Sequence, residues 1–180
     1  MSPGAILFRI WLGRAKFLAC AAVLLFIALV PVNASPQLIP GPDLLFGLIL
    51  AIVLRRPEFA PFWLLAPVLF LSDILQMRPP GLWALIVILA AEFTRAQEYR
   101  FRDLAFPVEW ALVAGVMFAA MSANHLILFL TLAAQSSFGA VMLHYLVTVL
   151  TYPLVSFICY FILQIRKVTP DVAIRFGRRL

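Results

Sequence analysis

The chain has 180 residues, of which 64% are hydrophobic and only 12% are charged, with a mean hydropathy of +1.04. One core cannot hide so much apolar surface at this size, so the totals exclude an ordinary soluble domain and indicate an integral membrane protein. The net charge of +6 does not indicate a nucleic-acid binder, because the cations lie between apolar runs or near the C-terminus and not on one solvated face.

Six apolar segments follow one another along the chain. A helix perpendicular to the bilayer needs about 20 residues to cross it, so segments two to four are short and the last two are long. We nevertheless predict an all-α membrane protein, a bundle of six transmembrane helices in a single domain over residues 1–180. The predicted spans are 15–30, 42–54, 60–75, 81–93, 106–134 and 139–165, followed by a basic cytoplasmic tail at 167–180.

The first segment permits two interpretations. Positive charges, an apolar run and small residues follow one another over residues 9–35, as in a cleavable signal peptide. The polytopic remainder of the chain favours an uncleaved first helix instead.

The positive charges predict the orientation. With six spans, the termini and two of the loops share one side of the membrane, and that side holds every lysine and arginine except Arg78. Cytoplasmic loops are enriched in these residues, so we expect both termini in the cytoplasm. The pair Arg55 and Arg56 is the inside signal between spans two and three. The one sizeable inner loop, 92–106, is either an interfacial helix or a solvated connector.

A helical hairpin over residues 66–91 is the most informative stretch. Pro80 and Gly81 end its turn, since proline lacks the backbone donor of a helix and glycine tolerates the reversed backbone of a tight turn. Asp73 lies in the first arm, where an ionised carboxylate needs a partner or water if the surroundings are lipid. We expect that partner to be Arg78 or an interfacial water.

Nothing in the sequence has the pattern of a catalytic, cofactor or metal site. It contains no GxSxG, HExxH or glycine-rich phosphate loop, and no cysteine and histidine spacing that holds a metal. We therefore predict a protein that is not an enzyme. Asp73, His125 and His144 occur at similar depths near the outer ends of their spans, which permits them to meet in a proton relay or ligand pocket. We favour the simpler interpretation, in which they contact water, a neighbouring cation or another helix.

Two runs of small residues predict helix-packing faces. Their members recur every three or four positions, and such faces let a second helix approach closely in lipid. Each face is expected to seat another helix of this chain or a helix of a partner. The first run is Ala15, Ala19 and Ala22, and the second is Ala111, Gly115 and Ala119.

Taken together, these features resemble the MreD family of rod shape-determining proteins. The resemblance rests on the six predicted spans, on Pro-Asp-Leu-Leu at the start of the second, on the hairpin DILQMRPPGLWALIVILA and on a last span that ends in arginine and lysine. Asp73 and Gly81 occupy the places of the aspartate and glycine with which that family closes its third span and turn. The chain departs from the family pattern at Leu69, where glycine is frequent, and in the turn QMRPPG, which is usually smaller and more polar.

The resemblance implies a non-catalytic scaffold of the bacterial inner membrane, required for rod shape and peptidoglycan synthesis and without a cofactor. The implied partners are MreC, whose single span would dock on a lipid-facing groove, the MreB filament, RodA and a penicillin-binding synthase.

The family is itself similar in fold to the substrate-binding component of energy-coupling-factor vitamin transporters, and such a component is the alternative function. In that case Asp73, Trp83, His125 or His144 would contact a small ligand in a closed outer cavity with convergent polar groups. The outer loops are short and sparsely polar, which favours the scaffold.

Overall fold

The computed structural model describes residues 3–29, 41–101, 105–131 and 137–161, and all regular structure within these ranges is helical. The helices are α1 (Pro3–Leu29), α2 (Leu44–Arg55), the short 3₁₀ helix η1 (Pro57–Phe59), α3 (Phe62–Leu75), α4 (Leu82–Phe101), α5 (Phe106–Leu130) and α6 (Phe138–Phe161). Three of them are long and apolar enough to cross a membrane, over Leu7–Leu29, Phe106–Leu130 and Phe138–Tyr160. The described part of the chain is therefore all-helical, and its three long apolar helices indicate a membrane protein.

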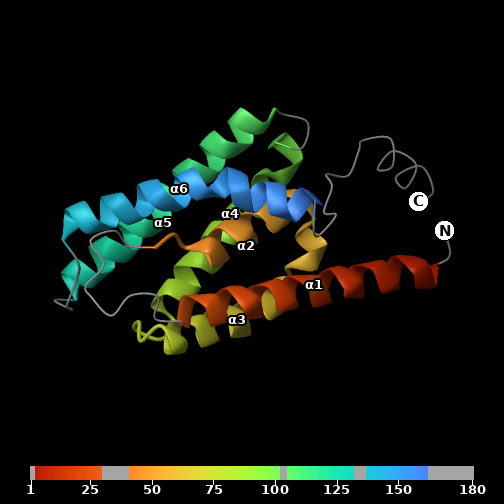
Figure 1. Cartoon of the computed structure of the whole chain (residues 1–180), viewed down its shortest axis with the longest axis horizontal. Coiled ribbons are helices and arrows are strands. Elements are labelled where there is room, and N and C mark those ends of the chain that lie inside the picture. The colour runs from red at the N-terminus through yellow and green to blue at the C-terminus, as the bar shows by residue number, and fades with distance from the viewer. Residues whose placement is uncertain (1–2, 30–40, 102–104, 132–136, 162–180) are drawn as a thin grey trace.

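The centre of the fold is α2. Every residue from Leu45 to Arg55 is buried, and the helix packs against α1, α4, α6 and η1. Figure 1 shows α2 between α1 on one side and α6 on the other. Its 12 residues give a length of about 18 Å, much less than the hydrocarbon layer of about 30 Å. A short helix that is apolar on all sides suits this position, where protein surrounds it.

Local sequence determines where α2 and α5 begin. The Asp43 side chain caps α2, because its Oδ1 accepts a hydrogen bond from the Phe46 amide at 3.0 Å. In α5, proline stands in the first turn, where its missing N–H is no loss, and Glu109 follows in the same turn. A carboxylate there is favoured by the partial positive charge of the helix N-terminus.

The first helix begins earlier than predicted, at Pro3 and not at residue 15. Contacts with η1 and α3 explain the extra turns. The Arg14 Nε donates to the Glu58 carbonyl at 3.2 Å, and the Arg14 guanidinium carbon lies 5.1 Å from the ring centroids of both Trp11 and Trp63. The cation–π contacts and the hydrogen bond hold the N-terminal half of α1 against the rest of the bundle.

Of the two alternatives predicted for the inner segment 92–106, a helix or a solvated connector, the structure has a helix over residues 92–101. Residues 92–101 continue α4 to Phe101, so the predicted fourth span, 81–93, is extended by two turns. Thr94 is fully buried, and Arg95 Nη2 donates to the Ala60 carbonyl at 2.7 Å. These contacts tie the end of α4 to the start of α3. The ends of the predicted fifth and sixth spans and the basic tail 167–180 lie outside the described residues.

Two glycines on long helices are expected to respond differently to an added methyl group. At Gly13 a Cβ would come within 2.5 Å of the Phe59 ring, whereas at Gly115 nothing lies within 4 Å. Gly13→Ala should lower the free energy of unfolding by about 1 kcal/mol, because the Phe59 ring must move. Gly115→Ala should leave it unchanged or raise it, since alanine is the better helix former. Thermal unfolding in detergent measures both, and equal losses would contradict the close packing at Gly13.

Candidate functional site

At one end of the bundle a buried ion pair joins three helices. Arg55 Nη2 lies 2.9 Å from Glu109 Oε1 and donates to Ser156 Oγ at 2.6 Å. The Tyr152 hydroxyl donates to the same Glu109 oxygen at 2.9 Å. The Arg55 and Glu109 side chains are only 7% and 2% exposed. We call these four residues the ion-pair cluster; they connect α2, α5 and α6.

The helix ends favour both charges of this cluster. Arg55 stands in the last turn of α2 and Glu109 in the first turn of α5, where the helix dipoles stabilise a cation and an anion respectively. Each charge is thus compensated by an opposite charge, by hydroxyl groups and by a dipole, as burial requires. Such a satisfied network is suited to holding helices together.

Sequence reasoning missed the ion-pair cluster. Arg55 was interpreted as a loop cation that orients the protein, but the structure places it inside the protein. Glu109 was not singled out at all. The available signal was a carboxylate within a predicted span, which in lipid demands a partner.

The Asp73 carboxylate caps the next helix and does not pair with Arg78. Its Oδ2 accepts hydrogen bonds from the amides of Gly81 at 2.9 Å and Ala84 at 3.1 Å, and the residue is fully buried. Gly81 has a φ of +87°, which brings its amide round to the carboxylate at little conformational cost. Pro80 lies exposed in this turn. The predicted hairpin is confirmed, and Asp73 fastens its two arms together.

A second ion pair lies at this end of the bundle, between residues that the sequence did not connect. Arg78 Nη1 lies 3.7 Å from Asp43 Oδ2, and the Arg78 guanidinium carbon is 5.5 Å from the Trp83 ring centroid. Both charged residues line a cavity of about 410 Å³, together with Gln76, His144 and the last turns of α1. We call it the polar cavity. Its wall is more polar than the walls of the other two cavities described below.

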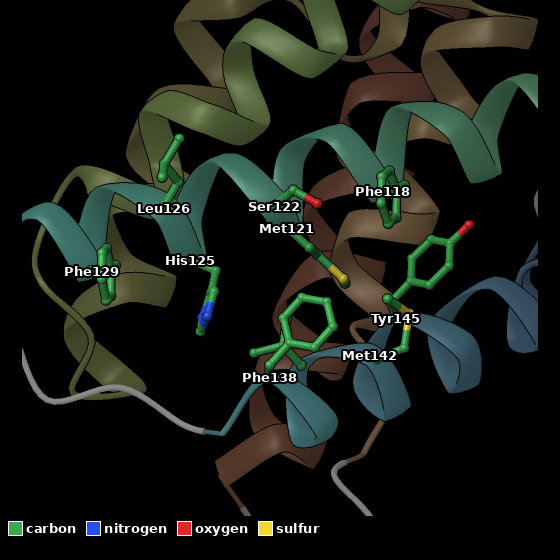
Figure 2. A pocket seen from close by; sticks show the side chains of 10 residues that line it. Phe118, Met121, Ser122, His125, Leu126, Phe129, Phe138, Met142 and Tyr145 are labelled. Carbon is green, nitrogen blue, oxygen red and sulfur yellow. The ribbon is translucent and has the colours of Figure 1, made fainter.

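The two histidines lie in different places. His144 lines the polar cavity, and its Nδ1 is buried without a hydrogen-bond partner in the described part of the chain. His125 lines a separate, largely apolar cavity of about 400 Å³ between α5 and α6. Figure 2 shows this second cavity, and the rings of His125 and Phe138 lie 6.1 Å apart. Asp73 lines neither cavity, so the three residues do not form the common site that their depths permitted.

An apolar groove with a volume of about 680 Å³ lies between α4 and α5. We call it the α4–α5 groove. Its floor includes the second predicted run of small residues, Ala111, Gly115 and Ala119, all of which are exposed. Its lining is Leu82, Leu85, Ile86, Leu89, Ala90 and Phe93 from α4, and Ala111, Leu112, Gly115, Val116, Ala119, Ala120, Ala123 and Ile127 from α5.

The first predicted run of small residues is also unoccupied by the described chain. Ala15, Ala19 and Ala22 are exposed, while Phe17, Ala21 and Leu25 form the buried face of α1. Each face was expected to seat another helix of this chain or a helix of a partner. No described helix of this chain covers either face.

Within the described residues no group of three or more histidine, cysteine or acidic side chains is placed to hold a metal. Comparisons of the chain with protein-family models, with curated protein sequences and with solved structures give no significant match.

Proposed function

We propose that this protein is a scaffold of the bacterial inner membrane that binds the single transmembrane helix of a partner in the α4–α5 groove. On the resemblance to the MreD family, that partner is MreC, and the assembly serves cell elongation with the MreB filament, RodA and a penicillin-binding synthase. The observation that carries the proposal is the groove itself, which is apolar, exposed and floored by small residues on α5.

The groove fits a helix for a geometrical reason. Ala111, Gly115, Ala119 and Ala123 are spaced four residues apart, so they line one face of α5 over about 18 Å. Small residues along such a line let a second backbone approach closely, which is how helices associate in lipid. This chain's own packing does not require glycine at 115, because a Cβ there would meet nothing within 4 Å. A small residue at this position suits an external helix that approaches closely.

We further propose that all six helices run across the membrane region, with the short α2 enclosed by protein and both termini in the cytoplasm. The support is the clustering of cations around η1 at one end of the bundle. Arg14 bonds to the Glu58 carbonyl, Arg56 lies 3.3 Å from the Glu58 carboxylate, and Arg95 bonds to the Ala60 carbonyl. Positive charge marks the cytoplasmic side, so this end faces inward and the turn between α3 and α4 faces outward.

The transporter alternative has less support from the site. Of the four contacts expected for a small ligand, only His144 lines the polar cavity, while His125 lines another cavity and Asp73 is engaged in capping α4. Scaffolding is therefore the function that the geometry supports best.

Blocking the groove is expected to abolish docking without unfolding the protein. Gly115→Leu and Ala119→Leu should each lower recovery of co-expressed MreC by tenfold or more, because the larger side chain prevents close packing of the two helices. A loss of about 1.4 kcal/mol in binding free energy lowers the affinity tenfold. The measurement is affinity recovery of tagged protein from mildly solubilised membranes, with thermal unfolding as the check on folding.

Ala19→Leu is the matched control, since it fills a small, exposed position on α1. It should leave recovery unchanged. Loss of MreC with Ala19→Leu and not with Gly115→Leu would move the docking face to α1. Recovery of a coupling membrane protein with ATPases in place of MreC would overturn the scaffold in favour of a transporter subunit.

A further inference from the structure

We propose that the polar cavity binds the headgroup of an aminophospholipid, with the phosphate at Arg78, the ammonium at Asp43 and the acyl chains along the end of α1. This site is separate from the α4–α5 groove and does not depend on the function proposed for that groove.

The charges of the cavity select a zwitterion. One guanidinium and one carboxylate stand side by side in its wall, so an anion alone would be repelled by Asp43 and a cation alone by Arg78. Their separation of 3.7 Å exceeds a hydrogen bond, so the carboxylate does not engage the planar fork of the guanidinium. A phosphate suits that fork, which binds phosphate oxygens through two parallel N–H groups.

The carboxylate is held in place independently of the ligand. Asp43 Oδ1 caps α2 through the Phe46 amide, and the Asp43 amide donates to Thr148 Oγ1 on α6 at 3.1 Å. Its Oδ2 is the oxygen nearest Arg78, and Asp43 is a residue of the cavity wall. A carboxylate fixed in this way accepts the hydrogen bonds of a primary ammonium without first having to become ordered.

His144 provides a further polar contact. Its Nδ1 is buried and has no hydrogen-bond partner within the described residues, and its side chain lines the same cavity as Asp43 and Arg78. Leaving a buried polar atom unpaired is unfavourable, so a ligand that supplies a hydrogen-bond partner stabilises the site. A primary ammonium has three N–H donors, and one of them is enough to bond to the Nδ1 of His144.

The apolar part of the wall distinguishes a lipid from a free zwitterion. Leu24, Leu25 and Ile27 of α1 line the cavity, and the same end of α1 exposes Phe26 and Leu29. An acyl chain that leaves the cavity along this surface covers side chains which are otherwise uncovered. The volume of about 410 Å³ lies within the range of small-molecule sites, about 300 to 1,000 Å³.

The binding test uses the purified full-length protein in detergent, stripped of lipid and titrated with three probes. These are dioleoyl phosphatidylethanolamine, dioleoyl phosphatidylglycerol and glycerophosphoethanolamine, which is the same zwitterionic head without chains. Native mass spectrometry gives the bound fraction. The ethanolamine lipid should bind at least tenfold more tightly than each of the other two. Equal binding of the two lipids would overturn recognition of the ammonium, and equally tight binding of the chainless head would overturn the lipid as the occupant.

Two variants test the assigned contacts. Asp43→Asn keeps a helix-capping side chain but removes the charge, so it should abolish the preference for the ethanolamine lipid over the glycerol lipid. Arg78→Gln should weaken binding of the ethanolamine lipid about tenfold, the effect of one lost charge-assisted contact. Arg56→Gln, the same change at the opposite end of the bundle, is the control and should bind as the parent does. If Arg56→Gln weakens binding as much as Arg78→Gln, the polar cavity is not the site.

Discussion

Glu109→Ala is expected to lower the free energy of unfolding by about 3 to 5 kcal/mol, the usual cost of removing one member of a buried ion pair. The reason is the position of Arg55. Its side chain is 7% exposed, and without Glu109 the guanidinium remains buried with Ser156 Oγ and the Ala51 carbonyl as its neighbours. The Tyr152 hydroxyl loses its acceptor in the same variant. The measurement is unfolding in mixed micelles with increasing dodecyl sulfate, followed by the fluorescence of the four tryptophans.

A double variant separates the unpaired charge from the lost packing. In Arg55→Met combined with Glu109→Leu, both charges are replaced by apolar side chains of similar size, and this exchange is often nearly neutral for a buried pair. The double variant should therefore be more stable than Glu109→Ala, although it carries two substitutions. If the losses of Arg55→Met and Glu109→Leu simply add in the double variant, the two side chains are not coupled and the ion-pair cluster is not a unit.

The predicted hairpin and the short second helix were accessible from the sequence because their signals are local. Proline and glycine between two apolar runs specify a turn, and the structure has it at Pro80 and Gly81. The segment 42–54 was recognised as apolar and short, and it is α2. Its role as the buried centre was not predicted, because a uniformly apolar run does not reveal whether lipid or protein surrounds it.

The sequence did not predict which charged residues pair, because the partners lie far apart along the chain. Arg55 and Glu109 are 54 residues apart, and a partner at that distance depends on how α2, α5 and α6 pack. Proximity along the chain was misleading for Asp73, which was expected to pair with Arg78, five residues later, or with an interfacial water. The turn instead directs the amides of Gly81 and Ala84 at the carboxylate, and Arg78 pairs with Asp43 on another helix.

The predicted bounds of α1 and α4 also differ from the structure, because they depend on contacts with other elements. The predicted first and fourth spans exclude residues 3–14 and 94–101, both of which contain charged side chains. The structure satisfies several of them against other elements, as in the bonds of Arg14 to Glu58 and Arg95 to Ala60. A charge with a partner of this kind does not end a helix, so both helices continue.

Asp73→Ala is expected to lower the free energy of unfolding by about 2 kcal/mol, because it leaves the amides of Gly81 and Ala84 without an acceptor at the buried start of α4. The effect should be concentrated in the hairpin, where α3 packs against α4. Hydrogen exchange in detergent, resolved by peptide, should show faster exchange over residues 76–90 and unchanged exchange in α6. Uniformly faster exchange along the whole chain would indicate a general loss of stability and not a lost cap.

Asp73→Asn is the matched control for this prediction. Asparagine keeps an oxygen where the two amides point and is as good a capping residue as aspartate, so the variant should retain most of the stability lost in Asp73→Ala. Its amide nitrogen takes the place of Oδ1, the buried oxygen that has no hydrogen-bond partner in the described part of the chain. If Asp73→Asn is as unstable as Asp73→Ala, the negative charge and not the hydrogen bonding of the turn is what α4 requires, and the carboxylate then acts on the helix dipole.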